Sequence, residues 1–170
     1  MALHLCLGDI TKMEADAIVN AANTDLKRAP GICDAIFAAA GPKELENACR
    51  AVGRCPIGRA VVTPGFNLPC KYIVHVAGPG WYGGAKREKL LLGACYHNAL
   101  QKAYAYGCRT IAVPLIFSGD CHIPRPDSIR IAGRAMRGFL ADHPMEATLV
   151  LYRPGIYEMA RLILEKELSG

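Results

Sequence analysis

The stretch 110-TIAVPLIF-117 is a run of eight residues that is almost entirely apolar. It lacks the alternation of polar and apolar residues that a half-exposed strand shows, and it is typical of a strand buried on both faces of a parallel sheet. Strand-like and helix-like segments alternate on both sides of it along the chain. This alternation predicts a three-layer α/β/α sandwich around a mixed, mostly parallel central sheet.

The other elements follow from the same periodicities. Short runs rich in β-forming residues predict further strands at 3–7, 16–20, 60–63, 70–76 and 148–152. Apolar residues three and four apart predict helices at 32–41, 42–53, 91–104 and 156–168, and one capped by Asp127 or Ser128. Because no internal repeat or linker interrupts this pattern, residues 1–170 are expected to form a single domain.

Composition excludes several classes of protein. The chain has 170 residues, of which 52% are hydrophobic and 21% charged, so it is too apolar to remain disordered. No apolar run reaches the eighteen or so residues that a membrane-spanning helix needs. The N-terminus shows no secretory signal, so we expect a cytoplasmic monomer without a membrane partner. The net charge is +5, but lysines and arginines are dispersed, which does not favour nucleic acid as a partner.

Eight cysteines are the unusual feature of the composition. No two of them form a C-x-x-C pair, and the chain is neither short nor poor in core residues, so a disulfide scaffold is not expected. A zinc site would need ligands at short paired spacings, and Cys121-His122 is a single adjacent pair. We therefore predict reduced thiols that mostly act as small apolar residues, and no metal.

Three segments follow predicted strands and carry polar or glycine residues, namely 8–10, 20–33 and 118–124. In open α/β sheets, ligands bind beyond the carboxyl ends of the strands, where such loops converge. Two of these loops lead into helices, whose N-terminal N–H groups suit a phosphate or diphosphate. The chain contains neither of the common glycine-rich phosphate motifs nor a G-x-S-x-G nucleophile turn.

Several strings together resemble the macrodomain family, in particular its MacroD-type branch. The resemblance covers about residues 3 to 165 and rests on 8-GDIT-11, 16-DAIVNAAN-23, 31-GICDAIFAAAG-41, 55-CPIGRAVVTPGFNLPCKYIVHVAGP-79 and 110-TIAVPLIFSG-119. It implies an ADP-ribose ligand without a cofactor, and ADP-ribosylated protein as a partner. That branch is similar to enzymes that remove mono-ADP-ribose from proteins or deacetylate O-acetyl-ADP-ribose.

The resemblance also implies roles for individual residues. Asp9 would accept from the adenine amino group beside the Ile10 N–H, Tyr152 would stack on adenine, and Asn23 would hold the distal ribose. Asn20 would fix the loop from beneath. The complete set of ligand-contacting residues that it implies is Asp9, Ile10, Asn20, Asn23, Gly31, Ile32, Cys33, Ser118, Gly119, Asp120, Cys121, His122, Ile123 and Tyr152.

Two departures from the family pattern concern catalysis and affinity. Cys33 stands where the family has its catalytic aspartate, and Asp34 follows one position later. One residue on a helix turns a side chain by about 100°, so Asp34 cannot take over that role without a local shift. In the second loop, residues 120–123 replace the family's aliphatic, aromatic, glycine and aromatic residues, which predicts weaker ligand binding.

Three functions remain open from the sequence. A hydrolase would use Asn23 to position the ribose, with Asp34 or the substrate's own phosphate orienting the attacking water. A non-catalytic reader would bind ADP-ribose through the same residues. A more remote alternative is a binder of nucleic acid or other anions, and a cysteine hydrolase using Cys33 with His122 is a further variant of the enzyme.

Overall fold

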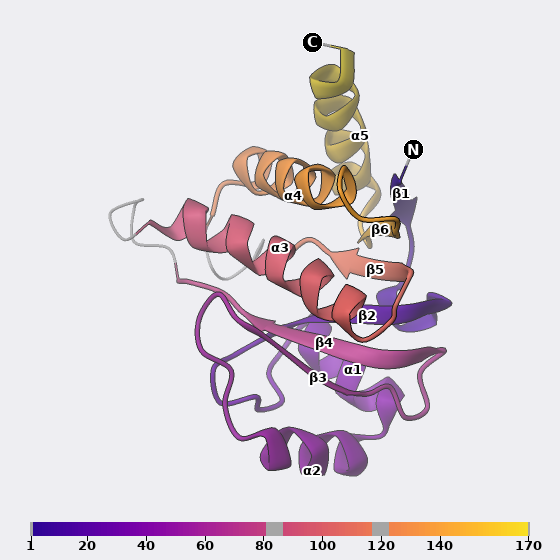
Figure 1. Cartoon of the computed structure of the whole chain (residues 1–170), viewed down its shortest axis with the longest axis vertical. Coiled ribbons are helices and arrows are strands. Elements are labelled where there is room, and N and C mark those ends of the chain that lie inside the picture. The colour runs from indigo at the N-terminus through magenta and orange to yellow at the C-terminus, as the bar shows by residue number, and fades with distance from the viewer. Residues whose placement is uncertain (1, 81–86, 117–122, 170) are drawn as a thin grey trace.

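The computed structural model describes residues 2–80, 87–116 and 123–169. Within them, six strands form one sheet in the order β1-β6-β5-β2-β4-β3 (Figure 1). The strands are β1 (Leu3–Leu7), β2 (Ala15–Ala22), β3 (Ala60–Pro64), β4 (Cys70–Ala77), β5 (Thr110–Pro114) and β6 (Glu146–Leu151). The helices are the short 3-10 helix η1 (Ile10–Lys12), α1 (Ile32–Ala40), α2 (Pro42–Val52), α3 (Glu88–Ala105), α4 (Arg125–Leu140) and α5 (Pro154–Ser169).

The sheet separates two layers of helices. Helices α1 and α2 cover one face, and α3, α4 and α5 cover the other (Figure 1). Strand β2 contributes to both cores, because Val19 packs with the α3–α5 layer and Ile18 with the α1–α2 layer. Only β3 runs antiparallel to its partner, β4, among the described pairs. The predicted three-layer sandwich with a mostly parallel sheet is confirmed.

Two predicted boundaries were wrong for identifiable reasons. Strand β5 ends at Pro114 and does not continue to residue 117, because proline offers no N–H to the sheet and Ile116 N–H donates instead to the Tyr96 hydroxyl at 2.8 Å. Helix α4 begins at Arg125 and is not capped by Asp127 or Ser128. Pro124 takes the capping position, and the Ser128 N–H already donates to its carbonyl at 2.9 Å. The remaining boundaries differ by three residues or fewer.

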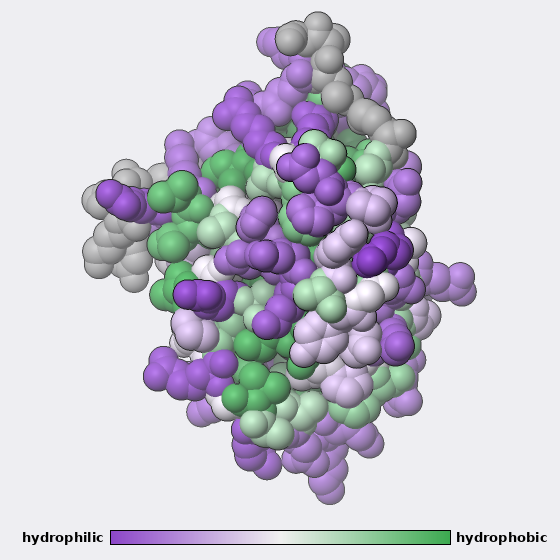
Figure 2. Space-filling model, viewed as in Figure 1, coloured by the Kyte–Doolittle hydropathy of each residue, from purple (hydrophilic) through white to green (hydrophobic). Residues whose placement is uncertain are grey.

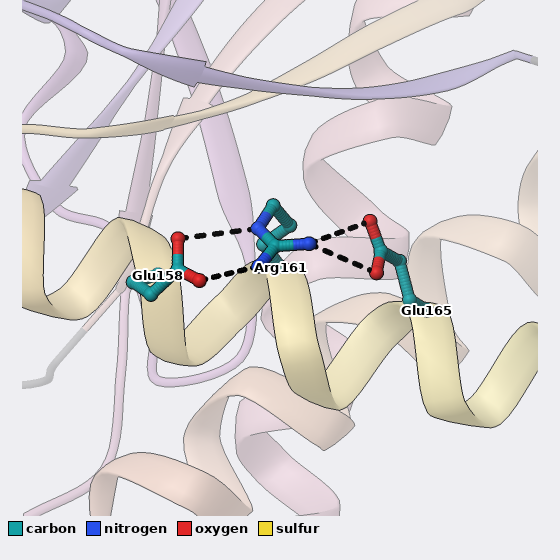
Figure 3. A network of polar contacts seen from close by, with 3 residues as sticks. All are labelled: Glu158, Arg161 and Glu165. Carbon is teal, nitrogen blue, oxygen red and sulfur yellow. Dashed lines mark hydrogen bonds and ion pairs between the residues drawn. The ribbon is translucent and has the colours of Figure 1, made fainter.

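Helices α4 and α5 are joined by polar contacts as well as by apolar packing. A guanidinium nitrogen of Arg134 (Nη2) lies 3.3 Å from Oε1 of Glu167, and Arg137 donates to the Leu164 carbonyl at 3.1 Å. On the exposed side of α5, Arg161 bonds both Glu158 and Glu165, one turn away in either direction (Figure 3). Hydrophilic residues cover much of these two helices on the face seen in Figure 2. None of the helices in the described part has the length and apolar character needed to cross a bilayer.

The cysteines of the described residues are all free thiols, and Cys121 lies outside those residues. Most are buried in the two cores. Burial raises the pKa of the Cys95 thiol to about 12 and that of Cys49 and Cys70 to about 11. These thiols are protonated near neutral pH and act as small apolar side chains.

Candidate functional site

A cleft of about 740 Å³ opens at the carboxyl ends of β1, β6, β5 and β2. These four strands are adjacent and parallel, so their ends meet at one edge of the sheet. The loops that follow them, together with the starts of α1, α4 and α5, form the walls. The volume is in the range of sites that hold small molecules and cofactors.

Asp9 lines the cleft at the β1 end. Its Oδ1 accepts from the Thr11 N–H at 2.9 Å and from the Thr11 hydroxyl at 2.7 Å, so Asp9 caps the 3-10 helix η1. These bonds lower the pKa of the Asp9 carboxyl, which is therefore ionised near neutral pH. Both bonds use Oδ1, and an ionised carboxylate has further acceptor capacity at Oδ2.

Tyr152 directly follows β6, the strand next to β1, and lines the same cleft. It is 77% exposed, which is unusual for an aromatic ring. The Gly8 N–H donates to the Leu151 carbonyl at 2.9 Å and ties the ends of β1 and β6 together. An ionised acceptor and an exposed aromatic surface therefore share this end of the cleft, and the buried Ile10 also lines it.

Asn23 lines the cleft after β2. Its Nδ2 donates to the Lys27 carbonyl at 2.9 Å, and its Oδ1 accepts from the Lys27 N–H at 3.0 Å. This pair of bonds closes the loop after β2 into a fixed shape. A primary amide has a second N–H and a second lone pair, so Asn23 retains one donor and one acceptor for a ligand.

The start of α1 forms the wall next to Asn23. Gly31 is the residue before the helix and has a φ of 90°, a backbone conformation that residues with a side chain rarely adopt. It lets the backbone turn sharply into the cleft, and Ile32 follows at the surface of the wall. The first N–H groups of a helix lack partners within the helix, so this wall can bind an anion.

Cys33 reaches the cleft from the first turn of α1 but is only 3% exposed. Its Sγ lies 3.7 Å from Nδ2 of Asn20 and 3.8 Å from the Lys27 carbonyl. The same Nδ2 lies 3.0 Å from Nδ1 of His75, and His75 Nε2 lies 2.9 Å from the Thr63 hydroxyl. An amide N–H can only donate, so Nδ1 accepts and the neutral ring carries its proton on Nε2.

This chain of contacts, from Thr63 through His75 and Asn20 to Cys33, is buried and joins β3, β4, β2 and α1. Burial lowers the pKa of His75 to about 4, so the ring is neutral near pH 7. Asn20 Oδ1 is buried and has no hydrogen-bond partner in the described structure. Asn20 is fully buried and does not line the cleft, so the structure places it beneath Cys33 and not among the cleft-lining side chains.

Asp34 does not reach the cleft. Its side chain is 54% exposed and pairs with Arg28, with 2.6 Å between Oδ1 and the guanidinium Nε. The one-residue offset from Cys33 turns it to the outer side of α1, as helix geometry requires. The structure therefore does not bring this candidate catalytic carboxylate to Asn23.

The second predicted loop is described only at its end. Ser118, Gly119, Asp120, Cys121 and His122 lie outside the described residues. Ile123 is 4% exposed and packs in the core beneath α3 and α4, so its side chain is not among those that line the cleft. An aliphatic side chain gains more from that core than from a polar cleft.

Several residues that line the cleft were not predicted from the sequence. Pro114, Leu115 and Ile156 contribute apolar surface, and Arg125 and Arg153 contribute positive charge. Both arginines could have been predicted from their place after a strand, because Arg125 is the first residue of α4 and Arg153 directly precedes α5. His75 could have been found as the one imidazole in the apolar run 70-CKYIVHV-76. No group of three or more metal-binding side chains occurs among the described residues.

Comparison with known proteins agrees with this architecture. A family model described as "Macro domain" matches residues 19–132. The Macro domain-containing protein CT2219 of Chlorobaculum tepidum is 46% identical over 140 residues, which are 82% of this chain and 81% of that protein. The O-acetyl-ADP-ribose deacetylase of Citrobacter koseri is 44% identical over 156 residues, 88% of each chain.

Solved structures give the same result. The Oceanobacillus iheyensis macrodomain with ADP has a TM-score of 0.92 at 32% identity, covering 98% of this chain and 92% of that one. A variant of that macrodomain with ADPR also has a TM-score of 0.92, at 30% identity, covering 99% and 94%. The Trypanosoma brucei macrodomain in complex with ADP has a TM-score of 0.87 at 30% identity, covering 95% and 68%. With its family model matched over more than half its length and relatives above 40% identity, this chain belongs to the macro domain family.

Proposed function

We propose that this chain binds ADP-ribose, free or attached to a protein, in the cleft at the carboxyl edge of its sheet. The observation that carries the proposal is the distribution of chemistry along the cleft. Asp9 and Tyr152 lie at one end, and Asn23 lies at the other beside the start of α1. The solved relatives that hold ADP or ADPR support the same ligand class.

Each part of the ligand has a matching group in this arrangement. The ionised Asp9 can accept from the exocyclic amine of adenine, and the exposed Tyr152 ring can stack on its face. The diphosphate suits the N–H groups at the start of α1, where Gly31 allows close approach. The remaining donor and acceptor of Asn23 suit the hydroxyls of the distal ribose.

Hydrolysis of O-acetyl-ADP-ribose or of mono-ADP-ribosyl esters is the second function we propose, and the deacetylase relative at 44% identity supports it. The resemblance implies that Cys33 takes the place of the family's aspartate, and Asp34 pairs with Arg28 outside the cleft. The attacking water would therefore be held by Asn23 and by a phosphate oxygen of the substrate. Among the described residues Asp9 is the one carboxylate that lines the cleft, and it lies at the end away from Asn23, so turnover is expected to be slow.

Two assays test these functions separately. Calorimetric titration with ADP-ribose should give saturable heat for the wild type and weaker binding for Asn23→Ala. Absence of heat at millimolar ligand would reject the binding assignment. Release of acetate from O-acetyl-ADP-ribose, and of ADP-ribose from a modified protein, tests hydrolysis. Binding without turnover would identify the chain as a reader module, and salt-dependent binding of generic RNA without ADP-ribose binding would favour the nucleic-acid alternative.

A further inference from the structure

The charges that line the cleft are unequal. Among the described wall residues, Asp9 is the one carboxylate, and Arg125 and Arg153 are the two cations. Asp9 is capped by Thr11 at the β1 end. The cleft therefore carries a net positive charge from side chains, before any contribution from helix ends is added.

The two arginines differ from most others in the chain. Eight arginines elsewhere in the described structure contact a carboxylate, an amide, a carbonyl or an aromatic ring, namely Arg28, Arg50, Arg54, Arg109, Arg130, Arg134, Arg137 and Arg161, whereas Arg59 and Arg87, which lie outside the cleft, have no such contact with a described residue. Arg125 and Arg153 are exposed and make no ion pair or side-chain hydrogen bond with a described residue. No described residue therefore competes with a ligand for their guanidinium groups.

Their position places both on one side of the cleft. Arg125 is the first residue of α4, and Arg153 directly precedes α5. These two helices pack against each other on the face of the sheet opposite α1 (Figure 1). The N-terminal ends of these two sixteen-residue helices both border the cleft and add partial positive charge to its wall. A ligand in the cleft would therefore have α1 on one side and the two arginines on the other.

We propose that Arg125 and Arg153, called here the arginine pair, determine specificity by recognising the phosphate groups of the ligand. This inference rests on the proposed ADP-ribose function and extends it. A guanidinium matches a phosphate with two parallel hydrogen bonds, which an ammonium cannot form. The arginine pair makes the cleft select nucleotides by phosphate number, in addition to the backbone N–H groups of α1.

A ligand series tests the arginine pair. Affinities of adenosine, AMP, ADP and ADP-ribose are measured by calorimetry for the wild type and for Arg125→Ala, Arg153→Ala and the double variant. Each single change should weaken ADP-ribose about threefold to tenfold, because the sites are exposed and screened by salt. Adenosine should bind all four proteins equally. The double variant should also show a smaller loss of ADP-ribose affinity as salt is raised.

Two control variants distinguish an effect of the arginine pair from a general effect of losing positive charge. Arg59 is exposed, outside the cleft and without an ion pair among the described residues, so Arg59→Ala should bind as the wild type does. The Arg125→Lys/Arg153→Lys variant keeps the charge and should recover part of the affinity. Equal ADP-ribose affinity in wild type and double variant, or an equal loss in Arg59→Ala, would overturn the inference while leaving the proposed function intact. A wild type that binds no ADP-ribose would instead reject the proposed function.

Discussion

The buried His75 ring makes a specific prediction about acid stability. Its pKa is lowered to about 4 by burial, whereas an unfolded histidine has a pKa of about 6.5. Between these values the unfolded chain binds a proton that the folded chain does not, so the free energy of unfolding falls as the pH falls. From pH 7 to pH 4.5 the loss is about 2 to 3 kcal/mol.

The contacts of His75 explain why the native structure does not accept this proton. Nδ1 already receives the Asn20 N–H at 3.0 Å, and Nε2 faces the Thr63 hydroxyl at 2.9 Å. Protonation of Nδ1 would place an N–H of His75 against the N–H of Asn20, so two donors would face each other inside the protein. Asp9 and Asp16 contribute little in this interval, because hydrogen bonds lower their pKa values and most of their stabilisation is lost below about pH 4.

Urea unfolding followed by circular dichroism at pH 7 and pH 4.5, at fixed ionic strength, measures the effect. For a slope of about 2 kcal/mol per molar urea, the wild-type midpoint should fall by about 1 M. His75→Gln cannot titrate and should lose much less between the two pH values, although it is less stable at pH 7. Ile73→Val weakens the same strand but keeps the histidine, so it should show the full wild-type loss. Equal losses in wild type and His75→Gln would show that His75 is not the group whose protonation destabilises the fold.

Five further substitutions test the cleft and the glycines. Tyr152→Ala should weaken ADP-ribose binding about threefold to tenfold in a calorimetric titration without changing the urea midpoint, since the ring is 77% exposed; unchanged affinity would exclude it from the site. Cys33→Asp should raise the rate of O-acetyl-ADP-ribose hydrolysis by about a hundredfold, because Cys33 lines the cleft and a carboxylate there would serve as a base; Asp34→Ala should leave the wild-type rate unchanged, and a lower rate would return Asp34 to the mechanism. Gly65→Ala should cost more than about 2 kcal/mol in urea unfolding, because its Cβ would lie 2.3 Å from the Cys70 carbonyl oxygen. Gly138→Ala, which meets nothing within 4 Å in helix α4, should instead stabilise by about 0.5 to 1 kcal/mol, and a loss would contradict the open space found there.

Much of the fold was predictable because its strands are short and apolar, and because helices follow β2, β4, β5 and β6 along the chain. The end of β5 was predicted wrongly, since the apolar residues continue to Phe117 in the sequence but the strand ends at Pro114. Hydrophobicity reports burial, whereas strand pairing also requires an N–H that proline lacks. The start of α4 was also predicted wrongly because of proline. Pro124 occupies the position before the helix, where the sequence had suggested Asp127 or Ser128 as the capping residue.

The cleft was predictable in its loops but not in its side-chain directions. Asp9, Asn23, Gly31 and Tyr152 lie in the cleft because each directly follows a strand or precedes a helix. The hydrogen bond from Asn20 to His75 joins residues far apart in the sequence, and no local pattern announces it. The role of Arg153 likewise depends on the approach of α5 to α4, which only tertiary structure establishes.

The central claim is that the cleft between α1 and the starts of α4 and α5 holds ADP-ribose. A crystal structure of this chain with ADP-ribose tests it most directly. We predict adenine between Asp9 and Tyr152, the diphosphate at the start of α1, and the distal ribose at Asn23 above Cys33. ADP-ribose bound elsewhere, or an empty cleft at ligand concentrations that saturate the calorimetric signal, would contradict the account.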